Sequence, residues 1–299
     1  MSQTIHPPEL PFSGERFTPE CVREMAYEHW HRYALASTLV DERRVLDAAC
    51  GEGYGSALLA TRAISVDGVD LSAEAVDHAR RRYHAENLRF HSASVTDLPA
   101  DDSCYDAVIS FETLEHLSQQ AEMLQEFRRV LRDTGFLMIS SPDKATYSDA
   151  TGYNNEFHVK ELYRDELLTL LKSQFPAVRL LGQAMAFQSL IWPVDGTPGA
   201  DPAGCQSLVM HEDRLEAAAV PPGQPLYFIA VCAAREADLP ALPGLSQFGD
   251  AEQSVYAHYQ HEIRKNMAAG KLLAERDQEI ERLRQALQEA KKGHPDHGV

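Results

Sequence analysis

Three ionisable side chains lie close together in "ISFETLEHL", the segment Ile109–Leu117. Glu112 and Glu115 are three positions apart, and Glu112 and His116 are four positions apart. On an α-helix, residues at these spacings share one face. The spacing therefore predicts a group that could hold a metal ion or move a proton. The alternative is the solvated start of a helix.

A second candidate site is the glycine-rich segment "VLDAACGEGYGS", Val45–Ser56. A short apolar run stops at three glycines, and a helical pattern follows. Glycines at such a point let the backbone turn sharply and approach a ligand closely. Acidic residues are expected at the ends of three successive strands, at a distance where one of them can meet ribose hydroxyls. They are Asp47, Asp70 and Asp97.

The glycine pattern does not fit a dinucleotide oxidoreductase. Such an enzyme would show G-x-G-x-x-G ending in a small residue, and a catalytic group for the nicotinamide side. The sequence shows neither.

Apolar runs alternate with helical patterns along the chain, and these strands and helices would hold the candidate site residues in place. Strands that alternate with helices predict a doubly wound (Rossmann-like) α/β fold, with a seven-stranded, mostly parallel sheet. Ligands bind such sheets at the carboxyl ends of the strands. The predicted strands begin at Arg44, Ser65, Leu88, Tyr105, Gly135, Ala177 and Pro225.

Composition narrows the class of protein. The 299 residues are 44% hydrophobic, with no apolar run of 18 residues and no signal-peptide pattern at the start, so we expect no transmembrane segment. Five scattered cysteines without a C-x-x-C pair argue against a zinc ribbon and fit the cytoplasm. A net charge of −17 disfavours nucleic acid as a partner. The basic run Arg80–Arg82 fits a solvated helix face.

Four parts are expected along the chain. They are an N-terminal capping segment and helix (1–40), an α/β domain (41–235), a linker (236–250) and a helical tail (251–299). In the tail, Leu273, Ile280 and Leu287 are seven positions apart, which predicts a short coiled coil. The alternative is a lone amphipathic helix. Residues 192–224 are rich in Pro, Gly and Ala and could form a lid, a partner-binding loop or a disordered insert.

The motif D-x-A-C-G-x-G, from Asp47 to Gly53, resembles class I S-adenosylmethionine-dependent methyltransferases over about residues 40–235. The resemblance implies that the glycines lie under the methionine part, that Asp70 accepts from the ribose hydroxyls and that Asp97 accepts from the adenine amino group. Cys50 fits a packed small side chain. The expected cofactor-binding set is Asp47, Cys50, Gly51, Gly53, Tyr54, Asp70, Leu71, Asp97, Leu98 and Tyr33.

The N-terminal segment is similar to an extension of bacterial relatives that carry "GERF-x-P-E" and "EH-x-H-R-Y", here Gly14–Glu20 and Glu28–Tyr33. A helix at this place commonly closes over the cofactor. The resemblance implies that His31 and Tyr33 reach the methionine carboxylate or the acceptor. The alternative is a packed amphipathic helix.

The E-x-x-E-H pattern resembles two metal-dependent groups, the small-RNA 2′-O-methyltransferases and the ubiquinone-pathway O-methyltransferases. The resemblance implies that Glu112, Glu115, His116 and His158 bind Mg²⁺ or Mn²⁺, and that the ion grips two adjacent acceptor hydroxyls. Many relatives carry only "LEH" and no metal. The alternative is therefore metal-free catalysis, with His116 or His158 as the base and Glu115 in an orienting role.

The N-terminal extension, the segment "GYNNEFHVKELY" and the tail together resemble bacterial methyltransferases of surface-polysaccharide assembly. The implied activity is O-methylation of a saccharide, such as an O-antigen chain. The tail would support self-association or contact with glycan machinery at the inner face of the membrane. The alternatives are methylation of a small aromatic or quinone precursor, or a cofactor-binding scaffold without catalysis.

Overall fold

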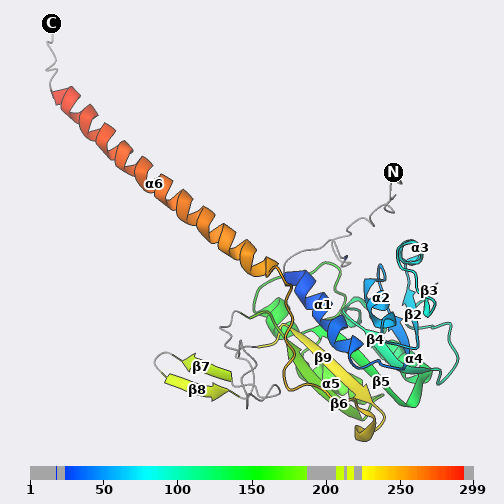
Figure 1. Ribbon diagram of the computed structural model, residues 1–299. Coiled ribbons are helices and arrows are strands. Elements are labelled where there is room, and N and C mark those ends of the chain that lie inside the picture. The colour runs from blue at the N-terminus through cyan, green and yellow to red at the C-terminus, as the bar shows by residue number, and fades with distance from the viewer. Residues whose placement is uncertain (1–17, 19–23, 187–206, 212–213, 219–223, 293–299) are drawn as a thin grey trace, which may run out of the picture. The chain divides into compact units, whose positions relative to one another are not determined.

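The structure is a computed structural model that describes residues 18, 24–186, 207–211, 214–218 and 224–292. The chain divides into two compact units, Met1–Phe248 and Gly249–Val299 (Figure 1).

The first unit is built on a seven-stranded sheet with the order β3-β2-β1-β4-β5-β9-β6. Only β9 is antiparallel to its neighbours β5 and β6, so the other strands share one direction. The predicted doubly wound fold is therefore confirmed. The strands are β1 (Arg44–Ala48), β2 (Ser65–Asp70), β3 (Leu88–Ser92), β4 (Tyr105–Ser110), β5 (Leu131–Pro142), β6 (Ala177–Gln183) and β9 (Tyr227–Ala233).

The strand order reverses between β1 and β4, which are adjacent in the sheet. The chain runs outward from β1 through β2 to β3 on one side, and from β4 through β5 on the other. The crevice at the carboxyl ends of two such strands is the usual ligand site of an open α/β sheet. The glycine segment follows β1, and the segment with Glu112, Glu115 and His116 follows β4.

Helices cover both faces of the sheet, over two apolar clusters. Neighbouring strand residues point to opposite faces, so Val45 joins one cluster and Leu46 the other. The first cluster packs α1 (Glu24–Ser37), α2 (Tyr54–Ala60) and α3 (Ala73–Arg82) on the sheet. The second packs α4 (Gln120–Val130) and α5 (Arg164–Lys172).

Several element bounds differ from the predictions. The strand predicted over 88–98 ends at Ser92, and only an isolated bridge between Ser94 and Asp97 follows, because the polar residues there form a turn. Within 192–224, β7 (Ser207–His211) and β8 (Arg214–Ala218) form an antiparallel hairpin that was not predicted. The other residues from 192 to 223 lie outside the described part.

Three short helices complete the first unit: η1 (Leu114–His116), the π-helix η2 (Ala145–Asp149) and η3 (Glu236–Asp238). The described part of the second unit is dominated by α6, Ser254–Lys292, a helix of 39 residues. No helix in the described ranges combines the length and the apolar character needed to cross a membrane.

Candidate functional site

The loop between β1 and α2 makes a sharp turn through backbone conformations that favour glycine. Gly51 has φ 57° and Gly53 has φ 95°. A Cβ at Gly53 would lie 2.8 Å from the Cβ of Ala79 and 2.9 Å from the ring of Phe90. The loop therefore packs directly on α3 and β3, and its backbone is open to a close approach from the crevice side.

Asp47, at the end of β1, is buried below this loop and receives two hydrogen bonds. The Tyr33 hydroxyl donates to Oδ1 at 3.0 Å, and the Ser56 hydroxyl donates to Oδ2 at 2.6 Å. Burial raises the pKa of Asp47 to about 7, although both hydrogen bonds act against that rise. Asp47 thus links α1, β1 and α2, as expected for a residue that shapes the loop.

Tyr33 is a packed residue of α1. A Cβ on Gly55 would lie 2.1 Å from its ring, and its own ring contacts those of Tyr54 and Phe111 at centroid distances of 5.1 and 5.0 Å. Its hydroxyl faces Asp47, and a direct contact with the cofactor stays a prediction. Nε2 of His31 forms a hydrogen bond of 2.9 Å with the Ser246 hydroxyl.

Asp70, at the end of β2, is held by two backbone donors. The Gly51 amide donates to Oδ2 at 2.9 Å, and the Ser72 amide donates to Oδ1 at 2.8 Å. The carboxylate is therefore fixed beside the glycine loop. Leu71 follows with 76% of its surface exposed, and its contact with the adenine stays a prediction.

The remaining cofactor candidates lie around this edge. Asp97 is exposed and Leu98 is buried in the turn after β3. Cys50 is buried, and burial raises the pKa of its thiol well above the usual range, so it packs as a small apolar side chain. The Tyr54 hydroxyl lies 3.4 Å from Nδ1 of His29.

The segment after β4 does not form the predicted α-helix face. Glu112 has φ 50°, and only a single 3-10 turn, Leu114–His116, follows. Glu112 accepts from the Ser140 hydroxyl at 2.6 Å and lies 3.5 Å from the guanidinium of Arg32. The prediction that Glu112, Glu115 and His116 share a helix face was therefore wrong.

Arg32 is the functional candidate that the sequence analysis missed. Its side chain is fully buried on α1, its Nε donates to Gln183 at 2.7 Å, and its guanidinium lies 4.4 Å from the centre of the Tyr227 ring. Glu28, one turn earlier, is also buried, and burial raises its pKa to about 7. The signal that the sequence offered for Arg32 was its place next to Tyr33, within a helix whose other residues are mostly packed.

Glu115 is buried, with 1% of its surface exposed, and neither carboxylate oxygen has a hydrogen-bond partner in the described part of the chain. Burial, reinforced by the charge of Glu112, holds its pKa well above the usual range. A carboxylate in this position requires either a proton or a cation. The backbone around Glu115 is fixed, because its carbonyl accepts from the amides of Val159 and Lys160.

His116 and His158 lie next to this carboxylate. His116 donates from Nδ1 to the carbonyl of Phe157 at 3.0 Å, which leaves Nε2 as an acceptor 3.9 Å from Oε1 of Glu115. The two imidazole rings are in contact, with centroids 5.0 Å apart. Nδ1 of His158 forms a hydrogen bond of 2.5 Å with the Glu161 carboxylate. Its Nε2 lies 3.0 Å from the side-chain amide nitrogen of Asn155.

Ligand atoms of Glu115, His116 and His158 lie within 4.8 Å of one another, which would suit one metal ion. The unpaired oxygens of Glu115 fit a cation. His158 could bind through Nε2 only after Asn155 moves away. Glu112, the fourth predicted ligand, belongs instead to the Arg32 and Ser140 contacts. The structure therefore brings together three of the four predicted ligands.

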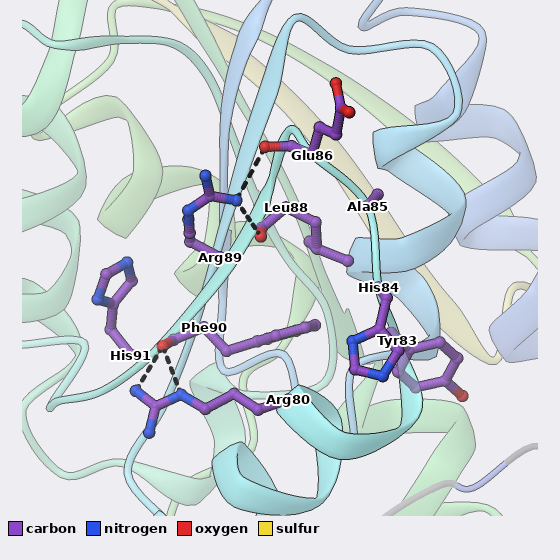
Figure 2. Close-up of a pocket in the computed structure, with 9 residues that line it drawn as sticks. All are labelled: Arg80, Tyr83, His84, Ala85, Glu86, Leu88, Arg89, Phe90 and His91. Carbon is purple, nitrogen blue, oxygen red and sulfur yellow. Dashed lines mark hydrogen bonds between the residues drawn. The ribbon is translucent and has the colours of Figure 1, made fainter.

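A cavity of about 740 Å³ lies elsewhere, at the outer edge of the sheet between α3 and β3. Figure 2 shows Arg80 bonded to the Phe90 carbonyl, and Arg89 bonded to those of Glu86 and Leu88. These arginines satisfy carbonyl groups around the edge strand, so they protect that edge. None of the predicted site residues lines this cavity.

Residues 46–139 match the family model described as "Methyltransferase domain". This range contains the glycine loop, Asp70, Asp97 and the Glu115–His116 turn, and it ends within β5.

Named relatives agree with this family. A protein of Mycobacterium tuberculosis named "Probable S-adenosylmethionine-dependent methyltransferase" is 38% identical over 173 residues, which cover 57% of this chain and 62% of that protein. The chain thus spans about three fifths of that relative's length. A fatty-acid O-methyltransferase of Mycolicibacterium smegmatis is 35% identical, covering 33% and 37% of the two chains. The solved YcgJ protein of Bacillus subtilis is 18% identical, covers 69% of this chain and 100% of that chain, and has a TM-score of 0.48.

We expect Gly55→Ala to destabilise the first unit, because the added methyl would overlap the Tyr33 ring. Forced overpacking of this kind costs about 1–3 kcal/mol or more. Thermal unfolding and calorimetric titration with S-adenosylhomocysteine should show a lower Tm and weaker binding. Gly244→Ala is the control, since nothing lies within 4 Å of its Cβ position. Equal behaviour of the two variants would contradict the packing argument.

The raised pKa of Asp47 predicts a pH-dependent stability. Its folded-state pKa of about 7 exceeds the ordinary value of 3.8, so the folded state holds a proton that the unfolded state releases. Stability should therefore fall as pH rises from about 4 to about 7, by up to about 1.4 kcal/mol per pH unit for one proton. Asp47→Asn should flatten this slope in urea unfolding. Glu28→Gln is the matched comparison, because the pKa of Glu28 is also raised to about 7, so this carboxyl group loses its proton over the same pH range. A slope unchanged in Asp47→Asn would argue against the assignment.

Proposed function

We propose that the chain is an S-adenosylmethionine-dependent O-methyltransferase with its acceptor at Glu115, His116 and His158. The main support is that Glu115 and His116 follow β4 and the glycine loop follows β1, the adjacent strands at the switch point of the sheet, while His158 joins the cluster from the segment after β5. A cofactor on the glycine loop would present its methyl group toward the end of β4. The named relatives support the cofactor, because they include S-adenosylmethionine-dependent methyltransferases.

The chain's own residues have distinct roles in this proposal. The Gly51–Gly53 backbone and Asp70 bind the cofactor, and Leu71 covers the adenine. When bound, S-adenosylmethionine supplies an electrophilic methyl group on a sulfonium. Nε2 of His116 would take the proton of the acceptor hydroxyl as that hydroxyl receives the methyl group from the sulfonium. Nδ1 of His116, bonded to the Phe157 carbonyl, fixes the ring for that transfer.

A divalent cation, Mg²⁺ or Mn²⁺, is the alternative to base catalysis in the same cluster, because it would take the Nε2 electron pair of His116. Glu115, His116 and His158 would hold it, and such an ion lowers the pKa of a bound hydroxyl and orients a vicinal diol. The support is the buried carboxylate of Glu115, whose oxygens have no hydrogen-bond partner in the described residues. Without an ion, Glu115 would be protonated and would orient the acceptor as a hydrogen-bond donor.

The acceptor class that we propose is a saccharide hydroxyl. Tyr153, Phe157 and Tyr163 are exposed in the segment that carries His158, and Tyr153 is 54% exposed. Aromatic rings bury the C–H faces of sugars, while a neighbouring amide such as that of Asn154 can bond hydroxyls. This mixture of flat apolar and polar groups supports a sugar ring beside the cluster.

A second candidate is a lipid carboxylate. The fatty-acid O-methyltransferase relative favours it, as does Val159, which is 62% exposed beside Phe157. The two acceptors differ in chemistry. A carboxylate is already deprotonated at pH 7, whereas a sugar hydroxyl must lose a proton during transfer.

His116→Gln tests the function and separates the two acceptors. With a hydroxyl acceptor, kcat should fall about 10²–10⁴-fold, because the base is lost. With a carboxylate acceptor the loss should be much smaller. Mass detection of methyl transfer onto glycans and fatty acids would measure both. His84→Gln, in the cavity between α3 and β3, is the control. No transfer to any acceptor, together with no S-adenosylhomocysteine binding by calorimetry, would refute the methyltransferase proposal.

Glu115→Gln tests the ion independently of activity. If the cluster holds Mn²⁺, calorimetric titration with MnCl₂ should show one site in the chelator-stripped protein, and the variant should bind at least tenfold more weakly. Glu122→Gln, on α4, serves as a control. Equal Mn²⁺ binding by all three proteins, or turnover that a chelator leaves unchanged, would remove the metal from the proposal.

A further inference from the structure

The long helix α6 presents apolar side chains to solvent along its length. Leu273 is 65% exposed and Leu287 is 57% exposed. Further exposed apolar side chains are Tyr256, Tyr259, Ile263, Met267, Leu272, Ile280 and Leu283. Helices in proteins gain most of their stability by packing an apolar face. We therefore expect another molecule to cover the exposed apolar surface of this 39-residue helix.

The spacing of these residues indicates what the partner is. Position a of a heptad is occupied by Tyr259, Asn266, Leu273, Ile280 and Leu287, and position d by Glu262, Ala269, Arg276 and Leu283. The apolar seam is densest from Leu273 to Leu287. Asn266 at position a is the kind of polar residue that fixes register and favours two strands in coiled coils.

The charges beside the seam favour one orientation. Glu279 occupies position g, and Arg284 occupies position e of the next heptad. In a parallel two-stranded coiled coil, position g of one helix contacts the following position e of the other, so two copies would form this attractive pair twice. In an antiparallel pair, position g faces position g, so Glu279 would not meet Arg284.

We propose that α6 joins two copies of this chain in a parallel, in-register coiled coil over residues 259–287. Within one chain Glu279 pairs with Arg282 at 2.7 Å, an exposed contact at position c that Arg284 of the second copy would replace. The charged residues at position d, Glu262 and Arg276, weaken the seam. The association should therefore depend on protein concentration.

Charge reversal on the full-length chain tests the orientation. Sedimentation equilibrium should show a dimer for the natural sequence. Glu279→Arg and Arg284→Glu should each raise the dimer dissociation constant about tenfold, because each turns two attractive pairs into repulsive ones. The double variant should recover the natural value, since it restores opposite charges. Glu281→Arg, at the outward position b, makes the same charge change as Glu279→Arg and should have no effect.

A cysteine at the seam tests the register. In a parallel, in-register pair the two Ile280→Cys side chains face each other, and oxidised glutathione should join their thiols in a disulfide, with glutathione as the product. Glu281→Cys should remain uncross-linked, as should the natural protein. S-adenosylhomocysteine binding should be unchanged in every variant, so a failed dimer is distinguishable from a failed methyltransferase domain. A monomer at all concentrations, or a double variant no better than the single ones, would overturn the proposal.

Discussion

The buried carboxyl group of Asp47 is the contact on which the geometry of the crevice depends. It is the common acceptor for Tyr33 of α1 and Ser56 of α2, and it stands on the strand that precedes the glycine loop. Burial of an acidic group is costly, and the raised pKa is the measure of that cost. The cost is offset because one side chain fixes three elements around the loop. The ring of Tyr33 also contacts Phe111, so the same contact reaches the end of β4.

Charge is organised differently around the end of β4. Three largely buried carboxyl groups, those of Glu28, Glu112 and Glu115, act on a single fully buried guanidinium, that of Arg32. One cation cannot balance three anions in a medium of low dielectric. The raised pKa values of Glu28 and Glu115 favour a proton on each of these two groups. Glu112 instead pairs with Arg32 and accepts from Ser140, and it is not among the ligand atoms grouped with His158.

Much of the fold could be predicted, because strand and helix periodicity repeat along the first unit and glycines follow the first strand. Asp47 and Asp70 lie at the ends of strands that the sequence indicated, and the Glu115–His116 turn follows another. The helix face around Glu112 could not be predicted, because one residue with a positive φ turns the chain there. The spacing of residues in sequence carries no sign of that turn. Arg32 was missed for a related reason: its burial depends on Gln183 and Tyr227, about 150 or more residues later.

The contacts of His158 bear directly on the choice between ion and proton. Its Nδ1 is engaged by Glu161, so a proton on that nitrogen is favoured and Nε2 is left as the electron-pair donor. Asn155 uses that pair in the structure at 3.0 Å. Removing one neutral hydrogen bond costs about 1 kcal/mol, whereas leaving the Glu115 carboxylate charged and unpaired in the interior costs several. A cation that recruits His158 would therefore lose little at Asn155 and gain most at Glu115. Since a proton can satisfy only one of the two Glu115 oxygens, the carboxylate, rather than either histidine, governs what the cluster binds.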